Sequence, residues 1–136
     1  MAEHRLAGLT APSLGDIETL ARQAFADLPD SFRALCGEVV ITVADFPADD
    51  VQHEMKAGPF DLLGLFQGVG LAQDGAIPET GRMPNMVFLY RRAILDYWAE
   101  HEETLGNIVT HVLVHEIGHH FGLSDDDMYA IEDQVP

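Results

Sequence analysis

Residues 115–125 read HEIGHHFGLSD, and this stretch is the most informative part of the sequence. Its first five residues follow the pattern HExxH, in which two histidines stand four residues apart. On a helix such residues lie about 40° apart around the axis, because each residue advances about 100°. His115 and His119 therefore share one helical face and are predicted to bind one metal ion together.

Glu116 follows the first of these histidines directly. On the same helix it lies about 60° from His119 around the axis, which places its carboxylate beside the metal. There it contacts a metal-bound water, so we predict Glu116 as the general base of a hydrolytic site. The competing interpretation is that HExxH arose by chance among core histidines satisfied by hydrogen bonds.

The residues after the second histidine supply a third ligand. Gly122 stands three residues beyond His119, where a glycine ends a helix through a positive φ. The chain then turns back and brings Asp125 to the same ion. Two histidines and one carboxylate leave a position for water, as catalytic zinc requires, so the sequence predicts one Zn²⁺ per chain at His115, His119 and Asp125.

The three consecutive aspartates also fit a purely structural role. Ser124 is placed as the N-cap of a last helix, and Asp125, Asp126 and Asp127 occupy its first turn, where the helix dipole favours negative charge. Both roles are compatible. Asp126 and Asp127 remain alternative ligands to Asp125.

Other side chains near the motif carry weaker signals. His111, one turn before His115, is predicted to be a partly exposed residue, with a proton shuttle or an alternative metal ligand as the second interpretation. His120 is predicted to be buried and either hydrogen-bonded or in contact with a metal ligand, and Gly118 to allow close packing of a neighbouring element. A second stabiliser of an oxyanion has four candidates, none preferred: Tyr90, Arg92, His101 and Tyr129.

Away from the motif, the pattern predicts an α+β fold with a small, mostly three-stranded sheet packed against the HExxH helix and flanking helices. β-branched or apolar runs predict strands at 38–46, 62–66 and 86–90. Apolar spacing of three and four predicts helices at 14–28, 93–101, 104–121 and 125–133. A long connection rich in glycine and proline, 68–84, is predicted to be a mobile or functional loop.

Length and charge narrow the classes of function. The 136 residues predict a single domain, 1–136, and 7 basic against 23 acidic side chains give a net charge of −16. This balance argues against binding to nucleic acid or to an anionic membrane. Cys36 is the only cysteine, so neither a disulfide within the chain nor a thiolate zinc cluster is possible. With no recognisable signal peptide, a cytoplasmic location is expected, and oligomeric state is left without a prediction.

The chain resembles the small bacterial zincin-like metallopeptidases with the HExxHxxGxxD pattern, called minimal zincins. The resemblance is carried by HEIGHHFGLSD, by LLGLFQGV at 62–69 and by MVFLYRRAI at 86–94. It implies a compact α+β zincin core, with His115, His119 and Asp125 as ligands and Glu116 as base. Metzincin-like enzymes have histidine where Asp125 stands, and this sequence has no Met-turn segment.

The leading hypothesis is a zinc metallopeptidase in which Glu116 activates a zinc-bound water to hydrolyse a peptide bond. A peptide or protein substrate is expected to pair with an edge strand near 62–68. One alternative is a non-catalytic module whose metal joins the last two helices. Another alternative is a non-haem iron protein, since two histidines and a carboxylate also bind iron in proteins of that class. The helical spacing of the histidines and the presence of Glu116 favour zinc.

Overall fold

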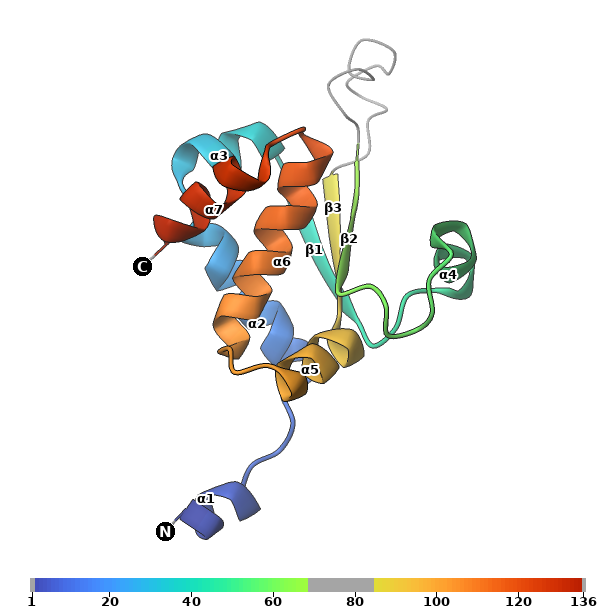
Figure 1. The fold of residues 1–136 in the computed structure, drawn as a ribbon, viewed down its shortest axis with the longest axis vertical. Helices are drawn as coiled ribbons and strands as arrows, with labels where there is room; N and C mark the ends of the chain where they lie inside the picture. The colour runs from blue at the N-terminus through green and yellow to red at the C-terminus, as the bar shows by residue number, and fades with distance from the viewer. Residues whose placement is uncertain (1, 69–84, 136) are drawn as a thin grey trace.

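The computed structural model describes residues 2–68 and 85–135 (Figure 1). The helices and strands in these two ranges are, in chain order, α1 (Ala2–Ala7), α2 (Leu14–Ala26), α3 (Asp30–Cys36), β1 (Val39–Ala44), α4 (Asp49–Met55), β2 (Gly64–Gln67), β3 (Asn85–Tyr90), α5 (Arg91–Glu100), α6 (Leu105–His120) and α7 (Asp125–Asp133).

The strands form one mixed sheet in the order β1, β3, β2. β1 runs parallel to β3, with Ile41 opposite Val87, and β2 runs antiparallel to β3, with Phe66 opposite the same Val87. Strands followed by helices on a small mixed sheet make this an α+β fold, so the predicted fold class is confirmed.

Two helices cover the sheet. α2 packs against β1 and α6, and α6 packs against α2, β2 and β3 (Figure 1). The core lies between these helices and the sheet. Its completely buried side chains include Ile17 and Ala21 of α2, Val87 and Leu89 of β3, and Val109, Leu113 and Ile117 of α6.

α6 is the central helix of the domain. It begins where the Thr104 side chain accepts a hydrogen bond from the Asn107 amide at 3.2 Å, which satisfies one of the free N–H groups of the first turn. The helix ends at His120, within a residue of each predicted boundary. The structure leaves His111 exposed, as the sequence predicts, and His119 is exposed as well.

The first half of the chain differs from the prediction. The predicted helix 14–28 ends at Ala26, and α3 begins directly after Pro29. Both α3 and α4 are seven residues long and were missed, because two turns hold too few apolar positions to establish a helical period. The predicted functional loop falls almost wholly on residues 69–84, outside the described residues.

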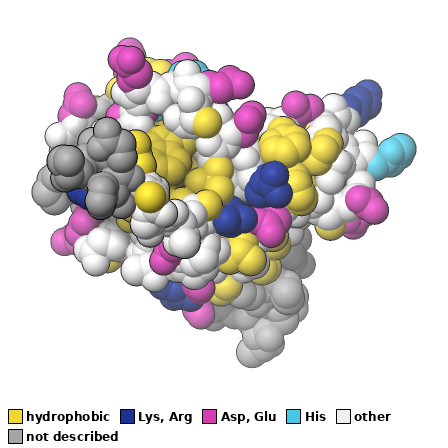
Figure 2. Space-filling model, turned by 90° about the horizontal axis from the view of Figure 1, so that it is seen from below, with side chains coloured by type: hydrophobic (Ala, Val, Ile, Leu, Met, Phe, Trp, Pro, Cys, Tyr) yellow, Lys and Arg dark blue, Asp and Glu magenta, His cyan; other side chains and the backbone are white. Residues whose placement is uncertain are grey.

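The surface is strongly acidic but has no single acidic face on the side that Figure 2 presents. That view shows Asp and Glu side chains spread around the molecule, with Lys and Arg side chains scattered between them. Among the helices of the described ranges, none has the length and apolarity needed to cross a membrane.

Gly64 sets the distance between α6 and the edge strand β2. A Cβ atom at this position would lie 2.7 Å from Val112 Cγ1 and 3.0 Å from the Phe88 carbonyl oxygen, and 3.4 Å from Glu116 Cγ. Val112 and Glu116 belong to α6, so the helix lies on this strand as closely as a glycine allows. The backbone of β2 and the side chain of Glu116 are therefore neighbours.

We predict that Gly64→Ala lowers the free energy of unfolding by about 1–3 kcal/mol, because the methyl group overpacks the interface between α6 and β2. Gly106→Ala is the matched control, since a Cβ at that helical position meets nothing within 4 Å. The control is expected to gain up to about 1 kcal/mol in helix propensity. Urea unfolding of the three proteins measures both effects. A Gly64→Ala protein as stable as the wild type contradicts the close packing.

Candidate metal centre

Three histidines form a stripe along α6. His111, His115 and His119 follow one another at intervals of four residues, so they share one face of the helix. The ring centroids of His111 and His115 are 3.9 Å apart, and those of His115 and His119 are 5.9 Å apart. Only the middle ring is largely buried: its side chain is 13% exposed, against 60% for His119.

The chain reverses after α6 at Gly122, as the sequence predicts. Gly122 has φ +77°, a conformation that few residues other than glycine adopt without strain. The Gly122 amide donates to the His119 carbonyl at 3.2 Å, and the Leu123 amide donates to the Gly118 carbonyl at 2.9 Å. These two bonds close the end of α6 and start α7 in the opposite direction.

α7 begins with a capping box formed by Ser124 and Asp127. The Ser124 hydroxyl accepts from the Asp127 amide at 3.1 Å, and the Asp127 carboxylate accepts from the Ser124 amide at 3.3 Å. The predicted N-cap is confirmed. Because the Asp127 carboxylate is engaged in this cap, it is less available for a metal than the carboxylate of Asp125.

α7 packs onto α6 through Met128 and Gly118. Met128 is completely buried, and a Cβ on Gly118 would overlap its Cγ and Sδ atoms. The predicted role of Gly118, close packing against a neighbouring element, is confirmed. This contact holds α7 beside the histidine stripe.

The reversal brings Asp125 close to the two histidines of the HExxH motif. Donor atoms of His115, His119 and Asp125 all lie within 4.8 Å of one another. His119 Nε2 and Asp125 Oδ1 are 3.8 Å apart, close to the ~3.4 Å that separates two ligand atoms on a tetrahedral zinc. The side chains of His119 and Asp125 are 60% and 75% exposed, so both are free to adjust.

His115 has the chemistry of a metal ligand. Its Nε2 atom is buried and has no hydrogen-bond partner among the described residues. Burial lowers the pKa of its imidazole, and the neighbouring His111 lowers that pKa further, whereas Glu132 raises it. The net shift favours the neutral ring, which is the form that binds a metal.

Glu116 follows His115 in the same turn of α6 and is partly buried. Burial raises the pKa of its carboxyl group, and the charge of His119 offsets part of that rise. A carboxyl group with a raised pKa is better matched to taking and returning a proton near neutral pH. Tyr90 is close enough for the charge of Glu116 to add to the rise that burial causes in the pKa of its hydroxyl group.

A cleft of about 1150 Å³ opens at this centre. It is lined by His115, Glu116 and His119 of α6 and by Leu63 and Gly64 at the start of β2. Asp125 does not line it. The two histidines and the carboxyl group of HExxH therefore face the same open space as the edge strand.

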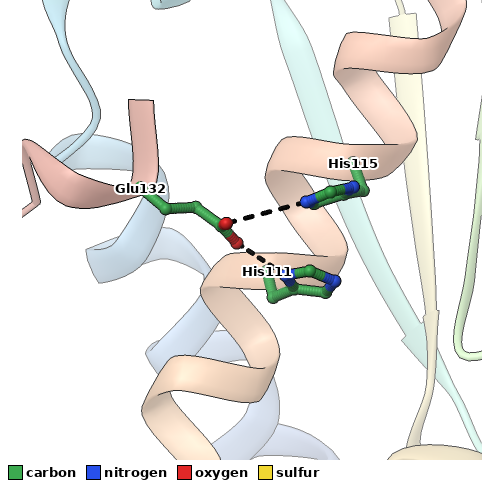
Figure 3. A group of neighbouring side chains, drawn as sticks. All are labelled: His111, His115 and Glu132. Atoms are coloured by element: carbon green, nitrogen blue, oxygen red, sulfur yellow. Dashed lines mark hydrogen bonds and ion pairs between the residues drawn. The ribbon is translucent and has the colours of Figure 1, made fainter. Parts of the chain in front are cut away.

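A second group of donor atoms lies one helical turn away, and Figure 3 shows its three side chains. Donor atoms of His111, His115 and Glu132 also lie within 4.8 Å of one another. Glu132 comes from α7 and was missed from the sequence. The signal was present, because Glu132 stands seven residues after Asp125, two helical turns along the same face.

The remaining predicted side chains have varied surroundings. The His120 ring packs 4.2 Å from that of Phe66, but its buried Nε2 has no partner among the described residues, so the predicted hydrogen bond is absent. Of the four oxyanion candidates, Tyr129 has its ring 5.5 Å from that of His115. His101 stacks on Tyr97 instead.

Arg92, another of the oxyanion candidates, lies beside two aromatic rings. Its guanidinium group is 5.5 Å from the ring centroid of Phe46 and 5.9 Å from that of Phe60. Tyr90 is only 3% exposed. These contacts give Arg92 a packing role and leave Tyr129 as the accessible hydroxyl beside the histidines.

Comparisons with known proteins identify the family and the fold. The sequence model of the zincin-like metallopeptidases matches residues 36–135, which span the sheet, the histidine stripe and α7. The fold is similar to that of a conserved hypothetical protein from Thermo thermophilus, with a TM-score of 0.53 and 16% sequence identity over 79% of this chain and 92% of that chain. The comparison with curated proteins finds no match.

We predict that Gly122→Ala lowers the free energy of unfolding by about 1–2 kcal/mol, because an L side chain is strained at this positive φ. A Cβ there meets nothing within 4 Å, so the loss is conformational and not steric. Gly122→Asn is expected to lose less, because asparagine tolerates the left-handed conformation. Urea unfolding in the presence of a chelator measures both losses without a contribution from metal. If Gly122→Ala and Gly122→Asn lose the same unfolding free energy, the positive φ at Gly122 is not the cause of the loss.

Proposed function

This chain belongs to the zincin-like metallopeptidase family, and we propose that it is a zinc-dependent peptidase. The observation that carries the proposal is the meeting of His115, Glu116 and His119 with the edge strand β2 around one cleft. Family membership confirms the relationship predicted from the sequence. The identity of the metal, its ligands and the hydrolytic reaction are proposed from the geometry of the site.

The proposed ligands of the zinc are His115, His119 and Asp125. The buried, unpartnered Nε2 of His115 supports this choice, because a metal ion satisfies an atom that otherwise loses its hydrogen bonds to water. A zinc ion bound there supplies Lewis-acid polarisation of a substrate carbonyl group and makes the attacking water more acidic. One carboxylate and two neutral imidazoles leave a net charge of +1, which partly offsets the acidity of the surface.

Glu116 is proposed as the general base and acid. Its carboxylate takes a proton from the attacking water and then delivers it to the nitrogen of the leaving amine. Glu116 lies next to the strand that borders the cleft. A Cβ atom built on Gly64 of that strand would be 3.4 Å from Glu116 Cγ. Tyr129, which is exposed and has its ring 5.5 Å from that of His115, is the proposed donor to a developing oxyanion.

An extended peptide is the proposed substrate, and β2 is its proposed docking strand. β2 pairs only with β3 among the described strands. The Tyr90 amide donates to the Leu63 carbonyl at 3.0 Å, so by alternation the backbone groups of Leu65 also face β3. Those of Gly64 and Phe66 point to the free edge, where a peptide backbone can pair with them.

We predict that wild-type protein binds about one equivalent of Zn²⁺ and that Asp125→Ala lowers the affinity at least tenfold, because a ligand is lost. Asp126→Ala is the matched control, as it removes the same charge from the same turn of α7. Chelator competition with elemental analysis gives both affinities. If Asp125→Ala binds zinc as tightly as the control does, Asp125 is not a ligand.

We predict that zinc stabilises the fold, because its ligands join the end of α6 to the start of α7. Binding to the native state alone adds about 2.7 kcal/mol at a free zinc concentration of one hundred times Kd. Thermal melts with zinc and with chelator measure the shift in Tm. Identical midpoints, once elemental analysis shows that the chelated sample has lost its metal, contradict the proposal.

We predict that Glu116→Gln retains zinc and folds normally while peptide hydrolysis falls by about 10²–10⁴-fold, because the amide cannot accept the proton of water. Glu100→Gln, at the exposed end of α5, is the matched control and keeps full activity. The assay digests a peptide library at equal zinc occupancy. Equal rates for wild type and Glu116→Gln reject the general base, and a wild type that cleaves nothing in the library favours the non-catalytic metal module.

A further inference from the structure

We propose that His111, His115 and Glu132 form a second metal position, which takes a zinc-like transition-metal ion in competition with the position at His119 and Asp125. The two groups share His115, the middle ring of the histidine stripe. Figure 3 shows the Glu132 carboxylate of α7 lying in front of both imidazoles of α6, with one oxygen turned to each ring.

The distances in this group suit a metal ion. Glu132 Oε1 lies 2.7 Å from His111 Nδ1, and Glu132 Oε2 lies 3.6 Å from His115 Nε2. These two values lie on either side of the ~3.4 Å that separates ligand atoms on a tetrahedral zinc. Small rotations of the three side chains therefore bring their donor atoms to one ion.

The protein alone does not satisfy this group. The Glu132 carboxylate reaches hydrogen-bond distance of His111 but not of His115, whose buried Nε2 is left without a partner among the described residues. Glu132 is only 19% exposed, so its charge has lost much of its contact with water. An ion between the three side chains satisfies the free nitrogen and compensates the carboxylate.

Two imidazoles and one carboxylate are a donor set that zinc and neighbouring transition metals prefer, whereas calcium and magnesium favour oxygen ligands. His111 is 51% exposed, so the position is open to an ion from solvent. The polar atoms come from two helices held together at Gly118 and Met128, which keeps the carboxylate beside the imidazoles.

Sharing of His115 makes the two positions alternatives. His115 coordinates an ion either with His111 and Glu132 or with His119 and Asp125. The total therefore remains about one ion per chain. An ion in the second position is therefore not bound by His119 and Asp125, the other two ligands of the proposed HExxH site. Metal binding there does not depend on the proposed peptidase activity.

The test uses the double variant His119→Ala/Asp125→Ala, which removes the first position and keeps the second. The probe is Co²⁺, whose visible absorption reports its ligands, with Zn²⁺ as competitor. We expect the double variant to bind about one Co²⁺, with an affinity about 10–100-fold below that of the wild type. Adding either Glu132→Gln or His111→Ala is expected to weaken binding by at least a further ~10-fold.

Adding Asp133→Asn to the double variant is the matched control, because Asp133 is the exposed acidic neighbour of Glu132 on α7. Circular dichroism checks that each variant is folded, and His111→Ala provides a second route if Glu132→Gln unfolds α7. The proposal is overturned if the double variant binds no Co²⁺ at millimolar concentration, or if the added changes weaken binding no more than the control does. Because the readout is Co²⁺ binding, a protein without peptidase activity still supports or rejects the second position.

Discussion

The contact between Gly118 and Met128 is the interaction on which both donor groups depend. Neither Asp125 nor Glu132 belongs to the helix that carries the histidines, and both reach it only because α7 folds back along α6. Met128 lies between them in the sequence and is completely buried in the space that the missing Cβ of Gly118 leaves free. A side chain at position 118 separates the two helices, and with them the carboxylates from the imidazoles.

The sequence signals that place His115, Glu116 and His119 on one helix are local. HExxH fixes two histidines and a glutamate on one helix, and Gly122 and Ser124 mark where that helix ends and the next begins. Glu132 was missed because its partner His111 stands 21 residues away, although the spacing from Asp125 places both carboxylates on one face of α7. The packing of Met128 on Gly118 decides which face of α7 packs against α6.

The fold shows the same division between local and distant signals. The three predicted strands and the long helices with strong apolar periodicity match the structure to within two residues at nearly every boundary. α3 and α4 were missed because helices of seven residues are stabilised by their surroundings more than by their own sequence. The closeness of Gly64 to Val112 was not foreseen either, because it joins residues 48 positions apart.

The helical hairpin also makes both donor groups depend on the position of the last helix. α6 is fixed to the sheet and to α2, whereas α7 is connected through the short turn at Gly122 and packs chiefly on α6. Both donor groups take their carboxylate from α7, so undocking of that helix would separate each carboxylate from its imidazoles. Local unfolding of the last helix, which hydrogen exchange of its backbone amides would measure, is therefore expected to disrupt both donor groups together.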